Sequence, residues 1–260
     1  MNLSRLAVNG LFAINGFAYA NWMARLPDFQ EVYGMDNGTL GMVLLCHAVG
    51  ALIAMPISGV LIVKYGSRNI TVWSGFLFVI MTPLLPLMPN VLTLGLWYGL
   101  MGSASGMLDV SMNAQAVLVE RQMNKPIMSS FHGVFSAGMM VGAGVAAVAI
   151  GQQLNLLQHL LIIAIIGLPL VTWSSRNLVA DAQQQNTVEE DSHFRWPARS
   201  LWGIGLVAFC CMLGEGSMAD WSTIYMENFA LADEAIAPLG LAAFSTAMMI
   251  GRFMGDRARQ

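Results

Sequence analysis

Long stretches of the chain contain no Asp, Glu, Lys or Arg, and they alternate with short polar segments. These charge-free runs cover 6–24, 37–63, 69–108, 126–175 and 200–214. A helix needs about 20 predominantly apolar residues to cross the hydrocarbon core of a bilayer. Because several runs reach this length and two are long enough for a pair of helices, the pattern indicates a multi-pass membrane protein.

Turn-forming residues divide the two longest runs. Three prolines between positions 83 and 89 interrupt the run at 69–108, and a Gly-Gln-Gln segment at 151–153 interrupts the run at 126–175. Such residues end helices, and no stretch alternates polar and apolar residues as a membrane strand requires. The predicted class is therefore all-α, a polytopic helical bundle with eight helices over 6–26, 40–63, 69–88, 91–118, 127–150, 156–175, 200–226 and 237–256.

The longest polar segment, 176–199, separates six predicted helices from two. It contains three successive glutamines, the acidic run Glu189-Glu190-Asp191 and few apolar residues. This composition is typical of a flexible linker. We expect a six-helix unit at 1–175, a cytoplasmic linker at 176–199, and the first two helices of an incomplete second unit at 200–260.

Composition narrows the class of function. The chain is 56% apolar and 10% charged, whereas a soluble domain carries roughly 25% charged residues, so the lipid bilayer is its expected surroundings. A net charge of −3 without a basic cluster excludes nucleic acid as the main partner. Cys46, Cys210 and Cys211 lie in apolar runs, so we expect no metal site and no cofactor. Catalytic motifs are absent, which argues against an enzyme.

Positive charges predict the orientation, since cytoplasmic loops retain Lys and Arg. If the N-terminus is cytoplasmic, Arg25 is the one positive residue outside. The other positive residues then lie inside: Arg5, Lys64, Arg68, Arg121, Lys125, Arg176, Arg195, Arg199, Arg252, Arg257 and Arg259. This asymmetry predicts a multi-pass protein of a bacterial-type inner membrane with a cytoplasmic N-terminus.

The first predicted helix also resembles a secretory signal, because Arg5 precedes an apolar stretch and Ala18-Tyr19-Ala20 resembles a cleavage site. The alternative is a retained first span. We favour the span, because Asn9 and Asn15 interrupt the apolar stretch and all that follows is membrane-embedded.

An internal repeat relates the two units. Ala20-Asn21-Trp22 in the helix at 6–26 matches Ala219-Asp220-Trp221 in the helix at 200–226. The two triplets are 199 positions apart, which predicts a parent of roughly 400 residues built from two parallel six-helix repeats.

Two loops carry a resemblance to a known family. The segment from Gly59 through Lys64-Tyr65-Gly66-Ser67-Arg68, and its counterpart Gly251-Arg252-Phe253-Met254-Gly255-Asp256-Arg257, are similar to the loop signature of the major facilitator superfamily. The resemblance implies a twelve-helix secondary transporter, of which this chain holds eight helices. It also implies that Gly59, Gly66, Arg68, Asp256 and Arg257 regulate closure of the cytoplasmic side, although Val63 replaces the usual Asp of the first copy.

Ionisable and polar residues inside the predicted helices are candidate site residues, because a charge within a span costs about 2.5–3.5 kcal/mol on insertion scales. Ser105, Asp109 and Asn113 recur every four residues and form one polar stripe. We expect Asp109 to face a cavity and bind substrate or a proton, with Asn113 beside it. The alternative is a buried Asp satisfied by a neighbouring helix.

Three other helices contribute candidates. Asn15 and Tyr19 share a face with Trp22 and are expected to contact a polar solute, although Trp22 and Trp221 are equally typical of an interfacial belt. His132 is either a substrate contact or an interhelical donor, whereas His47 and His159 are expected to be structural. Glu215 is the second proton-site candidate. Asp220 follows it by five residues and does not share its face.

The expected function is alternating-access transport of a small hydrophilic solute, a sugar or an organic acid, coupled to protons. Exporter signatures, a Pro in the helix at 127–150 and an Arg in the helix at 91–118, are absent, which disfavours a drug/proton antiporter without excluding it. A non-transporting membrane sensor and an inactive truncated fragment remain alternatives.

The expected outer gate is an ion pair between Arg25 and Asp220. Asp220 holds the position in its helix that Asn21 holds in the first helix, and the family resemblance implies that these helices approach each other outside. The alternatives for Arg25 are a pair with Asp28 and an anchor at lipid headgroups.

Overall fold

Each of the eight predicted ranges coincides with a long helix in the computed structural model, which describes residues 3–180, 198 and 201–258. No strand occurs within these ranges, and the all-α class is confirmed. The long helices are α1 (Leu3–Met23), α3 (Asn37–Tyr65), α4 (Ser67–Met81), α5 (Val91–Met123), α6 (Met128–Gly151), α7 (Leu156–Asn177), α8 (Trp202–Asn228) and α9 (Pro238–Ala258).

Local chemistry sets the helix ends. The side chains of Asp36, Asn90 and Asn155 accept hydrogen bonds from the backbone N–H three residues later, which satisfies donors that a helix start leaves free. Gly66 connects α3 to α4 with φ of 85°, a conformation that favours glycine.

The end of the predicted 69–88 helix differs from the expectation. The α-helix stops at Met81, and the 3₁₀ helix η1 (Thr82–Leu87) continues it. Pro83 and Pro86 lack the N–H that an α-helical turn requires, so the prolines change the helix type before they end the span.

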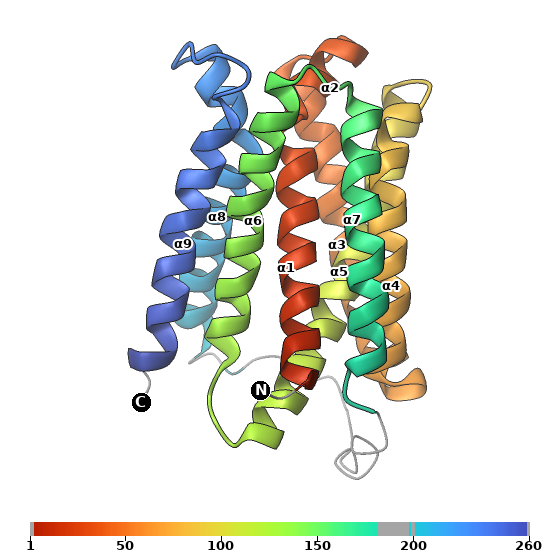
Figure 1. The fold of residues 1–260 in the computed structure, drawn as a ribbon, viewed down its shortest axis with the longest axis vertical. Helices are drawn as coiled ribbons and strands as arrows, with labels where there is room; N and C mark the ends of the chain where they lie inside the picture. Colours follow the sequence, from red (N-terminus) through yellow and green to blue (C-terminus); the bar gives the residue numbers. More distant parts are fainter. Residues whose placement is uncertain (1–2, 181–197, 199–200, 259–260) are drawn as a thin grey trace.

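A short helix, α2 (Leu26–Tyr33), lies in a segment that the sequence pattern left as a loop. It is too short to cross a membrane and carries Asp28 and Glu31 beside the buried Leu26 and Phe29. This amphipathic helix covers one end of α1 (Figure 1).

The long helices run side by side, and the N- and C-terminal ends lie at the same end of the molecule, opposite α2 (Figure 1). By length and composition, six of the described helical segments are able to cross a membrane: α3, α4 with η1, α5, α6, α7 and α8. The other two long helices, α1 and α9, are less apolar but lie in the same bundle, where polar side chains face protein rather than lipid.

Helix α1 lies among its neighbours, packed against α6, α7 and α5. Phe12 and Trp22 on this helix are almost completely buried. Glycines allow the closest approach: a Cβ atom on Gly138 of α6 would stand 2.2 Å from the carbonyl oxygen of Ala13 in α1. Small residues of this kind bring membrane helices together.

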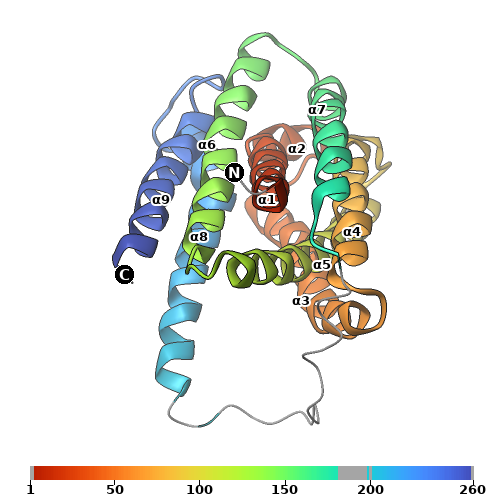
Figure 2. The same cartoon turned by 60° about the horizontal axis from the view of Figure 1, so that its bottom comes forward.

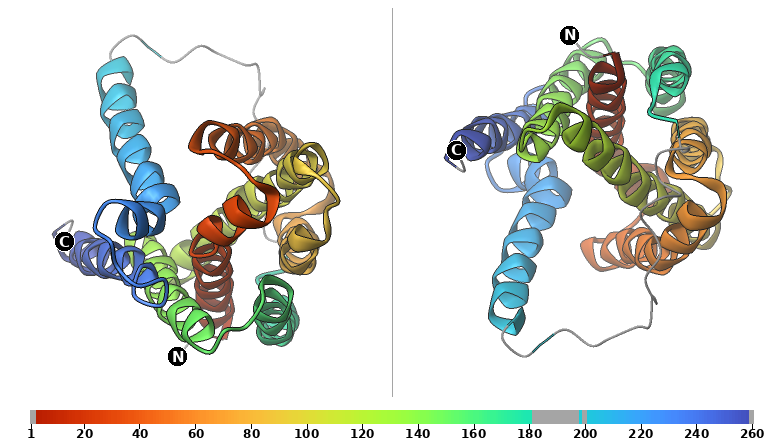
Figure 3. Two further views of the ribbon diagram at one scale, coloured as in Figure 1. Left: turned by 90° about the horizontal axis from the view of Figure 1, so that it is seen from above. Right: turned by 90° about the horizontal axis from the view of Figure 1, so that it is seen from below.

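Helix α8 packs unevenly along its length. Residues 201–214 are all exposed, whereas Ala219, Ser222, Thr223 and Ile224 are buried. Figures 2 and 3 show the first half of α8 leading away from the other helices. In contrast, α6 and α9 lie side by side, and Gly133 of α6 adjoins Phe253 of α9.

The predicted linker at 176–199 falls mostly outside the described residues, which omit 181–197, 199 and 200. The expected division into a six-helix unit and an incomplete second unit stays a prediction.

We expect Gly138→Ala to lower the free energy of unfolding by about 1–3 kcal/mol, because the new methyl group would meet the backbone of α1. Gly144→Ala is the matched control on the same helix, since nothing lies within 4 Å of its Cβ position. Thermal unfolding of both variants in detergent measures the difference. Equal stability of the two variants would contradict the α1–α6 packing.

The cytoplasmic orientation of the N-terminus predicts a labelling pattern in a background without Cys46, Cys210 and Cys211, which are exposed. In intact cells an impermeant thiol reagent should label cysteines at Glu31 and Gln152, two exposed positions at the α2 end that cap no helix start. Cysteines at Lys64 and Lys125, at the opposite end, should be protected until the cells are permeabilised. The reverse pattern would overturn the orientation.

Candidate functional site

A cavity of about 600 Å³ lies between α1, α3, α5, α6, α8 and α9. Most of its wall is apolar, with five methionines: Met23, Met55, Met139, Met212 and Met248. Polar and charged side chains are set into this wall: Asn15, Tyr19, Trp22, His47, Ser105, Asp109, Ser136, Glu215, Asp220, Ser245 and Arg252. Four of the six predicted substrate- or proton-binding residues, Asn15, Tyr19, Asp109 and Glu215, therefore line one cavity.

Helix α1 supplies Asn15, Tyr19 and Trp22, whose spacing of four and three residues places them on one face. The ring of Tyr19 lies 5.0 Å from that of Trp22, centroid to centroid. His47 of α3 joins them, at 5.7 Å from Tyr19 and 5.6 Å from Trp22. Trp22 is buried among these rings and does not occupy an exposed interfacial belt.

His47 is a cavity residue that the sequence reasoning missed, since it was expected to be only structural. The signal was available: His47 is an ionisable residue within an otherwise apolar span, the same argument that singled out Asp109. What the sequence lacked was the direction of its face, because few other polar residues on α3 mark one.

Helix α5 supplies Asp109 and Ser105 to the cavity wall. Asn113 donates a hydrogen bond to the Asp109 carboxylate at 3.2 Å and another to the Asp109 backbone carbonyl at 2.9 Å. Asn113 thus positions Asp109 and is not itself part of the cavity lining. Of the three residues in the predicted polar stripe, Ser105 and Asp109 line the cavity and Asn113 does not.

Glu215 of α8 forms an ion pair with Arg252 of α9, with 2.7 Å between Nη2 and Oε2. The same guanidinium donates to Ser136 Oγ of α6 at 2.8 Å and to the backbone carbonyl of His132 at 3.4 Å. Arg252 therefore joins three helices at the cavity wall. Arg252 lies within α9, and its assignment to the cytoplasmic positive charges stays a prediction.

His132 enters this arrangement through its backbone. The carbonyl accepts from Arg252, and from the Ser136 hydroxyl at 3.2 Å. The imidazole stands edge-on to Phe12 at 5.3 Å. The ring is not part of the cavity lining.

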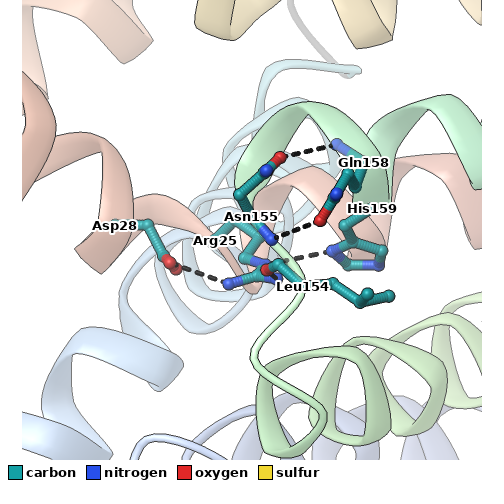
Figure 4. A network of polar contacts seen from close by, with 6 residues as sticks. All are labelled: Arg25, Asp28, Leu154, Asn155, Gln158 and His159. Carbon is teal, nitrogen blue, oxygen red and sulfur yellow. Dashed lines mark hydrogen bonds and ion pairs between the residues drawn. The ribbon is translucent and has the colours of Figure 1, made fainter.

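Arg25, the residue expected at an outer gate, is buried in a different network (Figure 4). It pairs with Asp28 at 2.7 Å, donates to the Leu154 carbonyl, and donates through Nε to His159 Nδ1 at 3.0 Å. His159 Nδ1 must therefore be unprotonated, so that Nε2–H donates to Asn21 Oδ1 at 2.8 Å. Burial raises the pKa of Asp28 above its ordinary value, although Arg25 acts to lower it.

The expected Arg25–Asp220 ion pair is not formed in this structure. Arg25 pairs with Asp28, which the sequence offered as the alternative partner. The pair forms because α2 places the Asp28 carboxylate beside the end of α1. Asp220 lines the cavity instead. His159 has the structural role that the sequence predicted.

The signature loop between α3 and α4 is well defined. Gly59 has open space around its Cβ position, and Gly66 makes the turn. Arg68 donates to the carbonyl of Ser175 in α7 at 3.1 and 3.3 Å, which ties this loop to another helix of the same unit. Asp256 and Arg257 lie in α9, and their side chains are outside the described part of the structure.

Metal chemistry has no evident place in the described ranges. No group of three or more His, Cys, Asp and Glu side chains there is arranged to hold a metal ion. The cavity instead offers hydrogen-bonding groups, aromatic rings and carboxylates, which suit the binding of a small polar organic molecule or a proton.

The sequence model of the Major Facilitator Superfamily matches residues 8–260, nearly the whole chain. The chain belongs to this superfamily. It is 34% identical over 246 residues to an uncharacterised MFS-type transporter of Yersinia pestis. The aligned region covers 95% of this chain and 63% of that transporter. The chain is 31% identical over 251 residues to an uncharacterised transporter of Sinorhizobium fredii, covering 94% of this chain and 65% of that protein.

A third superfamily relative is the membrane protein MosC of Rhizobium meliloti, 30% identical over 262 residues, with 99% of this chain and 62% of MosC covered. The chain thus spans less than two thirds of the length of these relatives. Its resemblance to the superfamily, based on the signature loops, is confirmed.

We expect a double-mutant cycle on unfolding in detergent to couple Arg25 with Asp28 and not with Asp220. Arg25→Gln and Asp28→Asn should show an interaction free energy of about 0.5–3 kcal/mol, because they share one buried ion pair. The cycle of Arg25→Gln with Asp220→Asn serves as the control and should give a value near zero. A larger interaction free energy for Arg25 with Asp220 than for Arg25 with Asp28 would support the Arg25–Asp220 gate instead.

Proposed function

We propose that this chain provides the solute cavity of a proton-coupled secondary transporter for a small hydrophilic solute, a sugar or an organic acid. The observation that carries the proposal is the cavity itself, with Asp109, Asp220 and several hydrogen-bonding groups on its wall. Substrate sites of secondary transporters lie at the interface between helical repeats. The expected partners are the solute, protons and the lipid bilayer.

Uneven packing supports an alternating-access mechanism. The C-terminal half of α8 is buried near α2, whereas its N-terminal half is exposed. Trp221 of α8 lies 3.9 Å from the Cβ position of Gly41 in α3, so these helices meet at the α2 end. With the N-terminus in the cytoplasm of a bacterial-type cell, this arrangement is closed outside and open inside.

The proton role is assigned to Asp109 first. Glu215, the other candidate, is neutralised by Arg252 at 2.7 Å, and protonation of a paired carboxylate disrupts that pair. Asp109 has an amide partner in Asn113 and, among the residues that the structure describes, forms no ion pair. Protonation would remove a charge from the cavity, and this couples proton binding to the change between the two states.

A drug/proton antiporter is the second candidate, and the methionine-rich wall favours it. Five flexible thioether side chains can adapt to apolar molecules of different shape. The polar groups on α1 and the absent exporter signatures favour the hydrophilic solute. The size and polarity of the transported solute distinguish a hydrophilic-solute transporter from a drug/proton antiporter.

The test uses a full-length carrier, in which this chain replaces the matching part of the Yersinia pestis relative. In proteoliposomes with an imposed pH gradient, a panel of sugars and organic acids should show accumulation of the transported solute. Asp109→Asn should reduce accumulation to equilibration, because the neutral amide cannot carry the proton, while solute exchange survives.

Asp36→Asn is the matched control, since Asp36 is an exposed carboxylate that caps α3; accumulation should continue in that variant. A pH-sensitive dye inside the vesicles reports proton movement at the same time. Full accumulation and proton movement in the Asp109→Asn carrier would remove Asp109 from the mechanism.

A further inference from the structure

Several polar residues that line the cavity each hold a buried side-chain atom without a hydrogen-bond partner. Among the residues that the structure describes, these atoms include Asn15 Oδ1, Trp22 Nε1, His47 Nε2 and Ser245 Oγ, and all four residues line the cavity. Each side chain is more than nine-tenths buried. Burying a polar group without a partner costs about 1–3 kcal/mol, so this set of atoms is matched to a polar ligand.

The set contains both a donor and an acceptor. The indole N–H of Trp22 can only donate, and the amide oxygen of Asn15 can only accept. The hydroxyl of Ser245 can do both. The rings of Trp22 and His47 are 5.6 Å apart, centroid to centroid, so these two residues lie beside each other. Ser245 approaches from α9, on a different wall.

Charges on the wall disfavour an anionic ligand. The one described cation, Arg252, is already paired with Glu215 and bonded to Ser136. Asp109 and Asp220 add two carboxylates without a cationic partner to the same cavity. An organic acid would therefore meet two like charges and no free cation.

A cationic ligand matches only part of the wall. An ammonium group offers donors, which the carboxylates and Asn15 Oδ1 could accept. It offers no acceptor for the indole N–H of Trp22. A hydroxyl group donates and accepts at once, so a molecule with several hydroxyl groups can satisfy both kinds of atom.

We propose that the cavity binds a neutral polyhydroxylated solute, such as a sugar or polyol, with Trp22 Nε1–H donating to it and Asn15 Oδ1 and Asp109 accepting from it. This deepens the proposed function and rests on it. The rings of Tyr19 and Trp22, 5.0 Å apart, supply an apolar surface for the C–H groups of such a molecule. Trp22 and Asn15 thereby determine specificity, and Arg252 keeps α8, α9 and α6 together.

The experiment measures binding to the purified 260-residue chain in detergent through the midpoint of thermal unfolding, which a ligand of the folded state raises. The probes are neutral hexoses, hexitols and myo-inositol, together with uronates and amino sugars of the same skeletons. A neutral probe should raise the midpoint saturably, and its charged analogues should require at least about tenfold higher concentrations, a difference of about 1.4 kcal/mol.

Trp22→Phe keeps the aromatic ring and removes the donor, so it should weaken binding of the neutral probe by about 2- to 12-fold, the range for one hydrogen bond. Asn15→Leu removes the acceptor at similar volume and should weaken binding by a similar factor. Trp73→Phe is the matched control, because Trp73 is 74% exposed and outside the cavity, and it should bind as the unmodified chain does.

Three results would overturn the proposal: no midpoint change with any neutral probe, charged analogues that bind as well as the neutral ones, or unchanged binding in both Trp22→Phe and Asn15→Leu. Binding of a charged analogue that is lost in Asp109→Asn would reject the neutral class and leave the cavity as a solute site. The proposed transport function fails separately, when the full-length carrier moves no protons.

Discussion

The cost of placing a charge inside a bilayer governs the arrangement of this molecule. A charged side chain is stable there only beside a partner or along a cavity. The described helices follow that constraint. Arg252 meets Glu215 across α8 and α9 and also reaches Ser136 of α6. Asp109 and Asp220 face the cavity, with Asn113 supporting the former. Large apolar side chains that remain exposed away from the cavity, including Trp73, Leu96 and Ile165, suit contact with lipid. The cavity therefore lies where six helices bring a few polar side chains into a mostly apolar wall.

The contacts of α8 and α9 with the first seven helices divide into two kinds. Helix α9 packs along α6, where glycines and Phe253 bring the helices close. Helix α8 contacts the bundle only near its C-terminal end, close to α2 and α3. Arg252 adds hydrogen bonds to Ser136 and His132 of α6 along the continuous contact.

The network around Arg25 shows how a short helix can redirect a charge. The sequence suggested a partner on α8, because Asn21 and Asp220 occupy equivalent positions in a repeat. Helix α2 instead places Asp28 at 2.7 Å from Arg25, the α6–α7 connection adds the Leu154 carbonyl, and α7 adds His159. Three neighbours satisfy the guanidinium, so it stabilises the α2 end of the first helices. The internal repeat relates backbone positions in the two units. It does not determine which of several nearby carboxylates forms the ion pair with Arg25.

The sequence by itself determined the all-α class, the positions of the eight long helices, the superfamily and much of the cavity, because charge-free length and helical spacing are local properties. Asp109, Asn15, Tyr19 and Glu215 were found in this way. Only the tertiary structure decided that Arg252 neutralises Glu215, that His47 joins Trp22, and that Asn113 supports Asp109 without lining the cavity. The first two facts depend on which faces of distant helices meet, whereas the bond from Asn113 to Asp109 lies within α5 and packing decides only that Asn113 is not part of the cavity lining. Spacing within one helix defines a face, but packing between helices, set by close approaches such as Gly138 on Ala13, decides what that face contacts.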